Sequence, residues 1–164
     1  MKNFYIITNL KKYQSTIIAG LVCVILGMLA GSFNSIKDYA WYAKLHHPNL
    51  TPPKWLFAPV WTILYFMIGV AFNKIWQAKQ TKLLRKFTII ILILHFISNL
   101  MWNYIFFSMR RIDIALYDLA FIWASLITLI IITRKINSVS LWLLPYLAWV
   151  SFALILNFTV YQLN

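Results

Sequence analysis

The sequence predicts an all-α fold, an integral membrane bundle of five transmembrane helices, and three observations lead to this prediction. The chain has 164 residues, of which 62% are hydrophobic and only 11% charged, and its mean hydropathy is +0.75. This leaves too little polar surface for a soluble globule and too little charge for a disordered chain. The charges are confined to short islands, and the five segments between them are each 19 to 29 residues long. Because about 20 helical residues cross a hydrocarbon core of roughly 30 Å, five spans fit.

The order of the elements follows from the apolar segments and the breaks between them. We expect transmembrane helices at about residues 14–34, 55–77, 86–108, 112–133 and 138–161, in one domain. Pro52-Pro53 ends helical structure before the second span, Arg110-Arg111 separates the third span from the fourth, and Asn137-Ser138 separates the fourth from the fifth. Only the first connection, residues 35–54, is long. The segments lack the period-two alternation that an outer-membrane barrel requires.

The first span allows two interpretations at each of its ends. Lys11-Lys12 followed by an apolar run resembles a signal peptide, but four more spans follow, so we interpret the run as the first membrane helix. Gly27-x-x-x-Gly31 lets another helix approach closely, either within the chain or across a homodimer. Packing within the chain is the safer interpretation.

The distribution of basic residues favours a cytoplasmic N-terminus. Of the fifteen lysines and arginines, ten lie in the islands on the N-terminal side of the five spans and five on the other side. By the positive-inside rule this bias places the long first loop outside the cytoplasm, although the opposite orientation stays open. The net charge of +12 then reflects membrane topology, and we expect no nucleic-acid partner.

The common catalytic and metal-binding motifs are absent from the sequence. One cysteine, Cys23, cannot form an intrachain disulfide, and four glycines cannot supply a phosphate-binding loop together with the ordinary turns. The His46-His47 pair has no cysteine or carboxylate at metal-ligand spacing nearby. We therefore expect no metal site and no conventional catalytic constellation.

Polar residues inside the predicted spans are candidates for function. Asp118 is the only acid within a span, and it must face protein or water or be protonated, because an ionised carboxylate in hydrocarbon costs several kcal/mol. A hydrogen bond to a neighbouring helix and a ligand or proton role are equally good interpretations. One face of the third span carries His95, Asn99, Trp102 and Phe106. A lone histidine on such a face is more often a hydrogen-bonded packing residue than a haem or metal ligand.

Aromatic residues recur at helical spacing on the second and fifth spans. The stripe on the second span begins with Ala58, Trp61 and Tyr65, and that on the fifth consists of Tyr146, Trp149, Ala153 and Asn157. Such stripes usually serve packing. The indole N–H groups of Trp61, Trp102 and Trp149 nevertheless need partners within the membrane, and their faces could wall an apolar pocket.

Several motifs between the first loop and the fifth span carry a resemblance to a known family. The first loop contains Trp41-Tyr42-Ala43-Lys44-Leu45 and Pro48, and the run Thr51-Pro52-Pro53-Lys54-Trp55 continues without a break to Tyr65. The third span has Asn99-x-x-Trp102-x-x-x-Phe106-Phe107, the fourth has Asp118, and the fifth has Pro145-Tyr146-Leu147-Ala148-Trp149 followed by Ala153 and Asn157. On these residues, over about 15–162, the chain resembles the tryptophan-rich sensory protein (TspO) family, also called translocator protein or peripheral-type benzodiazepine receptor.

The resemblance implies a five-helix bundle, commonly a homodimer, with a pocket beneath the first loop. In this family the pocket binds porphyrins, haem and synthetic isoquinoline or benzodiazepine drugs. Carried over by motif position, the ligand-binding residues would be Ala58, Trp61, Tyr65, Asn99, Trp102, Asp118, Trp149 and Ala153. The first loop, residues 35–54, would form a lid that includes Trp41, Pro48, Pro52 and Pro53. No cofactor is implied beyond the porphyrin or haem that binds as a ligand.

Two departures from the family pattern favour a bacterial-type member in a bacterial cell membrane. Ile114 stands where vertebrate members have a pocket tryptophan. The C-terminal cholesterol motif is absent, because no basic residue follows Tyr161. A sterol role is therefore disfavoured.

Three functions compete at this point. The first is a receptor or sensor for tetrapyrroles, with or without their transport or efflux, and it needs only the pocket. The second is a proton-coupled or passive transporter, motivated by Asp118, against which the lack of a visible inverted repeat counts. The third is an enzyme that degrades porphyrin under light, with Trp61 and Trp149 as its catalytic residues. We rank binding first, transport second and catalysis third.

Overall fold

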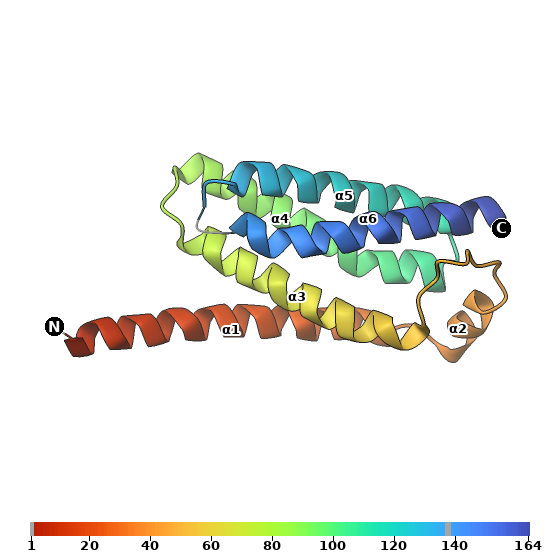
Figure 1. The fold of residues 1–164 in the computed structure, drawn as a ribbon, viewed down its shortest axis with the longest axis horizontal. Helices are drawn as coiled ribbons and strands as arrows, with labels where there is room; N and C mark the ends of the chain where they lie inside the picture. The colour runs from red at the N-terminus through yellow and green to blue at the C-terminus, as the bar shows by residue number, and fades with distance from the viewer. Residues whose placement is uncertain (1, 137–138) are drawn as a thin grey trace.

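The computed structural model describes residues 2–136 and 139–164, and it is built entirely around helices (Figure 1). The elements are α1 (Lys2–Ser32), α2 (Ile36–Tyr42), α3 (Lys54–Gln77), α4 (Lys82–Asn103) with a π-helical continuation (Tyr104–Ser108), α5 (Ile112–Thr133) and α6 (Val139–Leu163). Five of these helices are long and apolar enough to cross a membrane. The predicted all-α bundle of five transmembrane helices is thereby confirmed.

The helix ends differ from the predicted ones mainly at the N-terminus. Helix α1 begins at Lys2, not near residue 14, and its apolar span begins at Tyr13. Residues 2–12 contain neither proline nor glycine, so nothing in the backbone ends the helix at the charged island. The predicted break at Asn137-Ser138 lies outside the described residues.

The long first connection contains a helix where the sequence predicts a loop. Helix α2 is only 7 residues long, and Ser35 caps its N-terminus. The Ser35 side chain accepts a hydrogen bond from the backbone N–H of Asp38, and the Asp38 carboxylate accepts one from the backbone N–H of Ser35. This reciprocal capping box satisfies two N–H groups that would otherwise lack partners, which is why so short a helix forms.

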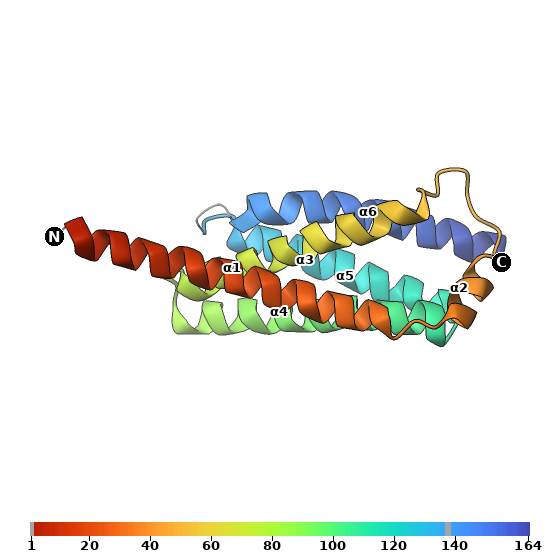
Figure 2. The ribbon, with the colours of Figure 1, turned by 90° about the horizontal axis from the view of Figure 1, so that it is seen from below.

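Helix α1 lies at the edge of the bundle and packs mainly against α3 (Figures 1 and 2). Glycines make this contact close. A Cβ atom added to Gly69 would lie 2.6 Å from the Cα atom of Gly20 and 2.6 Å from the carbonyl carbon of Ala19. Since these neighbours are backbone atoms that cannot rotate away, only glycine fits at position 69.

The two glycines predicted to receive a neighbouring helix behave differently. Gly27 lies against the ring of Tyr65 on α3, which confirms packing within the chain at this position. A Cβ atom added to Gly31 would have no neighbour within 4 Å, so this glycine borders open space. Within this chain no other helix therefore packs against Gly31.

The main core lies between α3, α4, α5 and α6. Its centre includes side chains with no exposed surface, among them Leu126, Leu129, Val139 and Leu143. Many large apolar side chains point outward instead, including Ile17, Ile93, Ile131 and Leu141. Acyl chains can cover such residues where water cannot, so the outward residues fit a lipid-facing surface and the inner ones hold the bundle together by close packing.

The two ends of the bundle carry different structures. The N-terminus and the connection between α3 and α4 lie at one end, whereas α2 and the C-terminus lie at the other (Figure 1). At this second end the first loop is tied to the last residue. The backbone N–H of His46 donates to Asn164 Oδ1 over 2.9 Å, and Asn164 Nδ2 donates to the His46 carbonyl over 3.1 Å.

Candidate functional site

A cavity of about 370 Å³ lies within the half of the bundle that α2 covers. Residues of α1, α3, α4, α5 and α6 form its walls, and Tyr39 and Tyr42 of α2 contribute from the first loop. Its volume falls in the range of about 300–1,000 Å³ that is typical of small-molecule sites. Most of its lining is apolar or aromatic, so it is suited to a flat hydrophobic ligand.

Seven of the eight predicted ligand-binding residues line this cavity: Ala58, Trp61, Tyr65, Asn99, Trp102, Trp149 and Ala153. They come from α3, α4 and α6, whose faces the helical spacing brings together. Asp118 is not among the lining residues. Its carboxylate accepts a hydrogen bond from the Ser98 hydroxyl, between α5 and α4. Asp118 is therefore the one predicted ligand-binding residue that lies away from the other seven.

The aromatic walls of the cavity hold one another in place. Trp61 lies 5.6 Å from Tyr65 and 6.4 Å from Tyr146, measured between ring centroids. Across the cavity Trp149 meets Phe57 edge-on at 6.0 Å. Because rings in tilted and edge-to-face contacts stabilise one another, the indole positions are preorganised.

Trp102 stacks on Phe106 with 4.9 Å between centroids and 20° between planes. A π-helical turn continues α4 here, with the Met109 N–H donating to the Tyr104 carbonyl five residues back. Phe106 is buried and Phe107 lies beside it, in edge-on contact. The turn thus directs two consecutive rings toward α2 and the cavity mouth.

Unpaired polar atoms are concentrated around the cavity. Nine buried side-chain nitrogen or oxygen atoms of the described residues have no hydrogen-bond partner, and six of them belong to residues that line the cavity. The six are Asn34 Oδ1, Asn99 Oδ1, Trp102 Nε1, Trp149 Nε1, and Oδ1 and Nδ2 of Asn157. Buried polar groups are normally paired, so this concentration marks where a partner from outside the chain would bind.

His95 lies beside the cavity and is fully buried. One ring nitrogen is 2.8 Å from Ser125 Oγ and the other 2.9 Å from Tyr146 Oη. Both nitrogens therefore have protein partners, as the interpretation of a hydrogen-bonded packing residue predicts. Across the described residues no three His, Cys, Asp or Glu side chains gather closely enough to hold a metal ion.

The predicted lid residues do not line the cavity. Trp41, Pro48, Pro52 and Pro53 are absent from the cavity wall, whereas Tyr39, Tyr42 and Lys54 contribute to it. Pro53 is the residue immediately before α3 and fixes where that helix starts. Burial raises the pKa of the Tyr42 phenol, so this ring stays neutral at the mouth.

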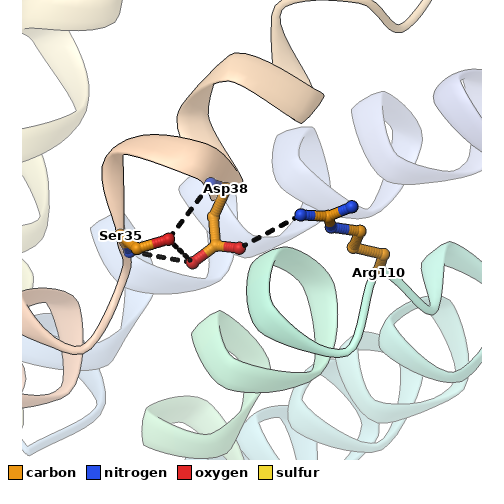
Figure 3. A network of polar contacts seen from close by, with 3 residues as sticks. All are labelled: Ser35, Asp38 and Arg110. Carbon is orange, nitrogen blue, oxygen red and sulfur yellow. Dashed lines mark hydrogen bonds and ion pairs between the residues drawn. The ribbon is translucent and has the colours of Figure 1, made fainter.

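An ion pair fastens α2 to the turn between α4 and α5 (Figure 3). Arg110 Nη2 lies 3.8 Å from Asp38 Oδ1, and the guanidinium carbon lies 5.8 Å from the centroid of Trp41. Hydrogen bonds from the Ser35 backbone N–H and hydroxyl, together with nearby Arg110, hold the pKa of the Asp38 carboxyl below its usual range. Asp38 therefore stays ionised at neutral pH and keeps both its capping role and its ion pair.

Arg110 adopts a left-handed backbone conformation, with a φ of 55°. This conformation is uncommon for a residue other than glycine and costs of order 1 kcal/mol. The contacts of its side chain with Asp38 and Trp41 offset that cost and account for an arginine at a position where the backbone favours glycine.

The charge of the cavity lining is positive. Within the described part of the chain, the wall contains one cation, Lys54 at the first turn of α3, and no acidic residue. The site therefore favours neutral or anionic ligands over cations. Lys54 and Asn157 were not among the predicted ligand-binding residues, although both lie within the motifs that carry the family resemblance.

Comparison with known proteins identifies the group to which this bundle belongs. A model of the TspO/MBR family matches residues 19–163, which include most of the first span and the whole of the other four. The chain belongs to the TspO/MBR family.

Similar proteins in this family come from bacteria, archaea and mammals. The chain is 38% identical over 149 residues to the tryptophan-rich protein TspO of Chlorobaculum tepidum, covering 87% of this chain and 91% of that protein. It is 35% identical over 154 residues to the tryptophan-rich protein TspO of Archaeoglobus fulgidus, covering 90% and 96%. It is 31% identical over 142 residues to the translocator protein of Bos taurus, covering 84% and 83%.

As a TspO/MBR member, the protein is a multi-pass membrane protein with five spanning helices. The matched residues include every residue that lines the cavity, whereas the first turns of α1 lie outside the match. The residues that match the family model therefore include the whole of the cavity lining.

Proposed function

We propose that this protein is a membrane receptor or sensor that binds tetrapyrroles, such as protoporphyrin IX and haem, in the cavity under α2. Isoquinoline- and benzodiazepine-type compounds bind at the same place. The observation that supports this function is the combination of aromatic walls with six unpaired buried polar atoms in one cavity. A flat macrocycle would stack on the indoles while its polar edge pairs with those atoms.

The charge of the site supports a tetrapyrrole over other flat aromatic molecules. Protoporphyrin and haem carry propionate groups, and Lys54 supplies the cation on the cavity wall. No acidic residue of the described chain lines the cavity to repel a carboxylate. An apolar macrocycle with an anionic edge therefore matches the wall both in shape and in charge.

A titration in the dark tests this function. Purified protein in detergent is titrated with protoporphyrin IX, and quenching of tryptophan fluorescence is followed in wild type, Trp149→Phe and the control Trp142→Phe. Trp142 is on the same helix but does not line the cavity. We expect saturable quenching whose Kd rises about tenfold in Trp149→Phe, because an indole donor and part of a stacking surface are lost, and stays unchanged in Trp142→Phe. Non-saturating quenching that is identical in all three proteins would refute the pocket.

Light-dependent degradation of a bound porphyrin is a second candidate, supported by the presence of both Trp61 and Trp149 on the cavity wall. It predicts a product that forms only under illumination and is lost in Trp61→Phe and Trp149→Phe while dark binding persists. Proton-coupled transport has weaker support, because Asp118, which motivated it, does not line the cavity. Unchanged uptake into proteoliposomes by Asp118→Asn would remove this residue from any transport mechanism.

We further propose a bacterial cell membrane as the location, a cytoplasmic N-terminus and a homodimer. The bias of basic residues toward the N-terminal side supports the orientation. Protease accessibility of a tag on each terminus would test it, since a five-span chain must have its termini on opposite sides.

A further inference from the structure

A chain of hydrogen bonds runs from α5 through α4 and α6 to the cavity wall. Ser125 Oγ lies 2.8 Å from His95 Nδ1, His95 Nε2 lies 2.9 Å from Tyr146 Oη, and Tyr146 Oη lies 2.8 Å from Asn99 Nδ2. All four residues are more than nine-tenths buried, at 7%, 0%, 0% and 3% exposure respectively. Water therefore cannot substitute for the partners of Ser125, His95 and Tyr146, so each proton between these residues must have one definite place.

The serine at the start of this chain sets its direction. A hydroxyl has a single proton, and Ser125 donates it to the Ile122 carbonyl over 3.0 Å. Toward His95 the Ser125 oxygen can then only accept, so Nδ1 carries the proton. The proton order at His95 therefore depends on the Ser125 hydroxyl.

The proton on His95 Nδ1 determines the positions of the other protons in the chain of hydrogen bonds. A charged ring at a fully buried site is costly, so His95 is neutral and its Nε2 is an acceptor. The Tyr146 hydroxyl donates to Nε2 and accepts from Asn99 Nδ2. A reversed Asn99 carboxamide would bring Oδ1 against a hydroxyl oxygen whose only proton is already used. The Asn99 carboxamide is thus held in one orientation.

This orientation leaves Asn99 Oδ1 as an acceptor without a partner among the described residues, and Asn99 lines the cavity. We propose that His95 is a positioning residue that fixes the Asn99 carboxamide through Tyr146, so that the cavity selects ligands donating an N–H or O–H to Asn99 Oδ1. The inference rests on the proposed binding function and adds the polarity of the ligand. An unpaired buried acceptor is costly, and a ligand donor relieves that cost where a methylated analogue cannot.

Two matched probes test the selection. Isoquinolin-1(2H)-one is a flat lactam with one N–H group, and its N-methyl derivative has the same ring system without the donor. Saturation-transfer NMR measures the affinity of each for wild type, His95→Phe and the control Ser151→Ala. Ser151 is on α6, hydrogen-bonds Trp123 and the Leu147 carbonyl, and does not line the cavity.

We expect wild type and Ser151→Ala to bind the N–H lactam about five times more tightly than the N-methyl compound. In His95→Phe the Tyr146 hydroxyl loses its acceptor and is free to donate to Asn99 Oδ1, so the carboxamide reverses and the preference falls to about one or inverts. Any steric cost of the methyl group is the same in all three proteins, so the change in the ratio reports the carboxamide alone. Equal affinities in wild type would overturn the inference, as would a preference that survives in His95→Phe.

A second measurement uses wild-type protein without a ligand, so it does not depend on whether a variant folds. Wild type labelled with ¹⁵N-histidine should show a one-bond N–H coupling at Nδ1 of the buried histidine and none at Nε2. A proton on Nε2 would reverse the whole chain and overturn the inference. The proposed function is judged separately, by saturable binding of protoporphyrin IX, so that binding without lactam selectivity refutes only the inference.

Discussion

Replacing Tyr146 by phenylalanine should destabilise the bundle by more than the loss of one ordinary hydrogen bond. Tyr146 is fully buried, and its hydroxyl joins His95 to Asn99. Its removal leaves His95 Nε2 as a buried acceptor without a partner, at a cost of about 1–3 kcal/mol. Asn99 Nδ2 loses a bond worth about 0.5–1.5 kcal/mol, the smaller figure because Asn99 lies on the cavity, where other partners can reach it. Together these terms predict a loss of about 1.5–4.5 kcal/mol in the free energy of unfolding.

Titration with sodium dodecyl sulfate in mixed micelles, followed by tryptophan fluorescence, measures this free energy. The control is Tyr117→Phe, because Tyr117 is 76% exposed and its hydroxyl can reach solvent or lipid headgroups. A typical interhelical hydrogen bond in a membrane protein contributes only about 0.6 kcal/mol. A loss below about 1 kcal/mol for Tyr146→Phe, or one equal to that of the control, would show that His95 finds another partner and would refute the reasoning.

Three further predictions concern α1, α2 and the cavity wall. Gly69→Leu should separate α1 from α3 and lower the free energy of unfolding by about 1–3 kcal/mol in the same titration, whereas Gly31→Ala, which meets no atom within 4 Å, should leave it unchanged. Asp38→Asn should reduce hydrogen-exchange protection of the α2 amides at neutral pH. The lowered pKa of Asp38 means that its contribution is complete above the ordinary value of 3.8 and is lost only as the pH falls below it, so wild-type protection of α2 should persist down to about pH 4 and loss near pH 6 would contradict this. Lys54→Gln should weaken protoporphyrin IX but not its dimethyl ester, whereas Lys44→Gln, which does not line the cavity, should affect neither.

The five spans were predictable because one quantity, the length of uncharged sequence, sets them. The predicted boundaries of the second and fourth spans, 55–77 and 112–133, agree with α3 and α5 within one residue. Hydropathy reports where lipid can cover a helix, which is why the extension of α1 back to Lys2 was missed. The segment Lys2–Lys12 ends in two lysines and so lies outside the uncharged run, yet its residues continue a helix readily.

The local sequence contains a signal for the start of helix α2. Ser35-Ile36-Lys37-Asp38 has the spacing of a capping box, with a serine followed three residues later by an acid. The prolines of the same connection, taken alone, predict a loop. The ion pair between Asp38 and Arg110 could not have been predicted, because it joins two loops whose approach depends on how all the helices pack.

The candidate site shows the same division between local and long-range information. Helical spacing placed Trp61 and Tyr65 on one face, and Asn99 and Trp102 on another, and both faces do line the cavity. Asp118 could not be assigned in this way, because the side of α5 that meets the cavity depends on how α5 is rotated about its own axis. In the structure this rotation turns Asp118 toward Ser98 on α4.

The polar character of the cavity depends on the positions of single protons. A sequence reports that Asn99 is present but not which end of its carboxamide faces a ligand. Here that choice follows from the Ser125 hydroxyl, which accepts from His95 Nδ1 because its own proton goes to the Ile122 carbonyl, and no local motif reveals this arrangement. Ser125→Ala removes this acceptor, so the proton should no longer be fixed on Nδ1 and the preference for N–H ligands should fall toward one. ¹⁵N-histidine spectra of Ser125→Ala measure the tautomer directly, and a proton that stays on Nδ1 alone would contradict the role of Ser125.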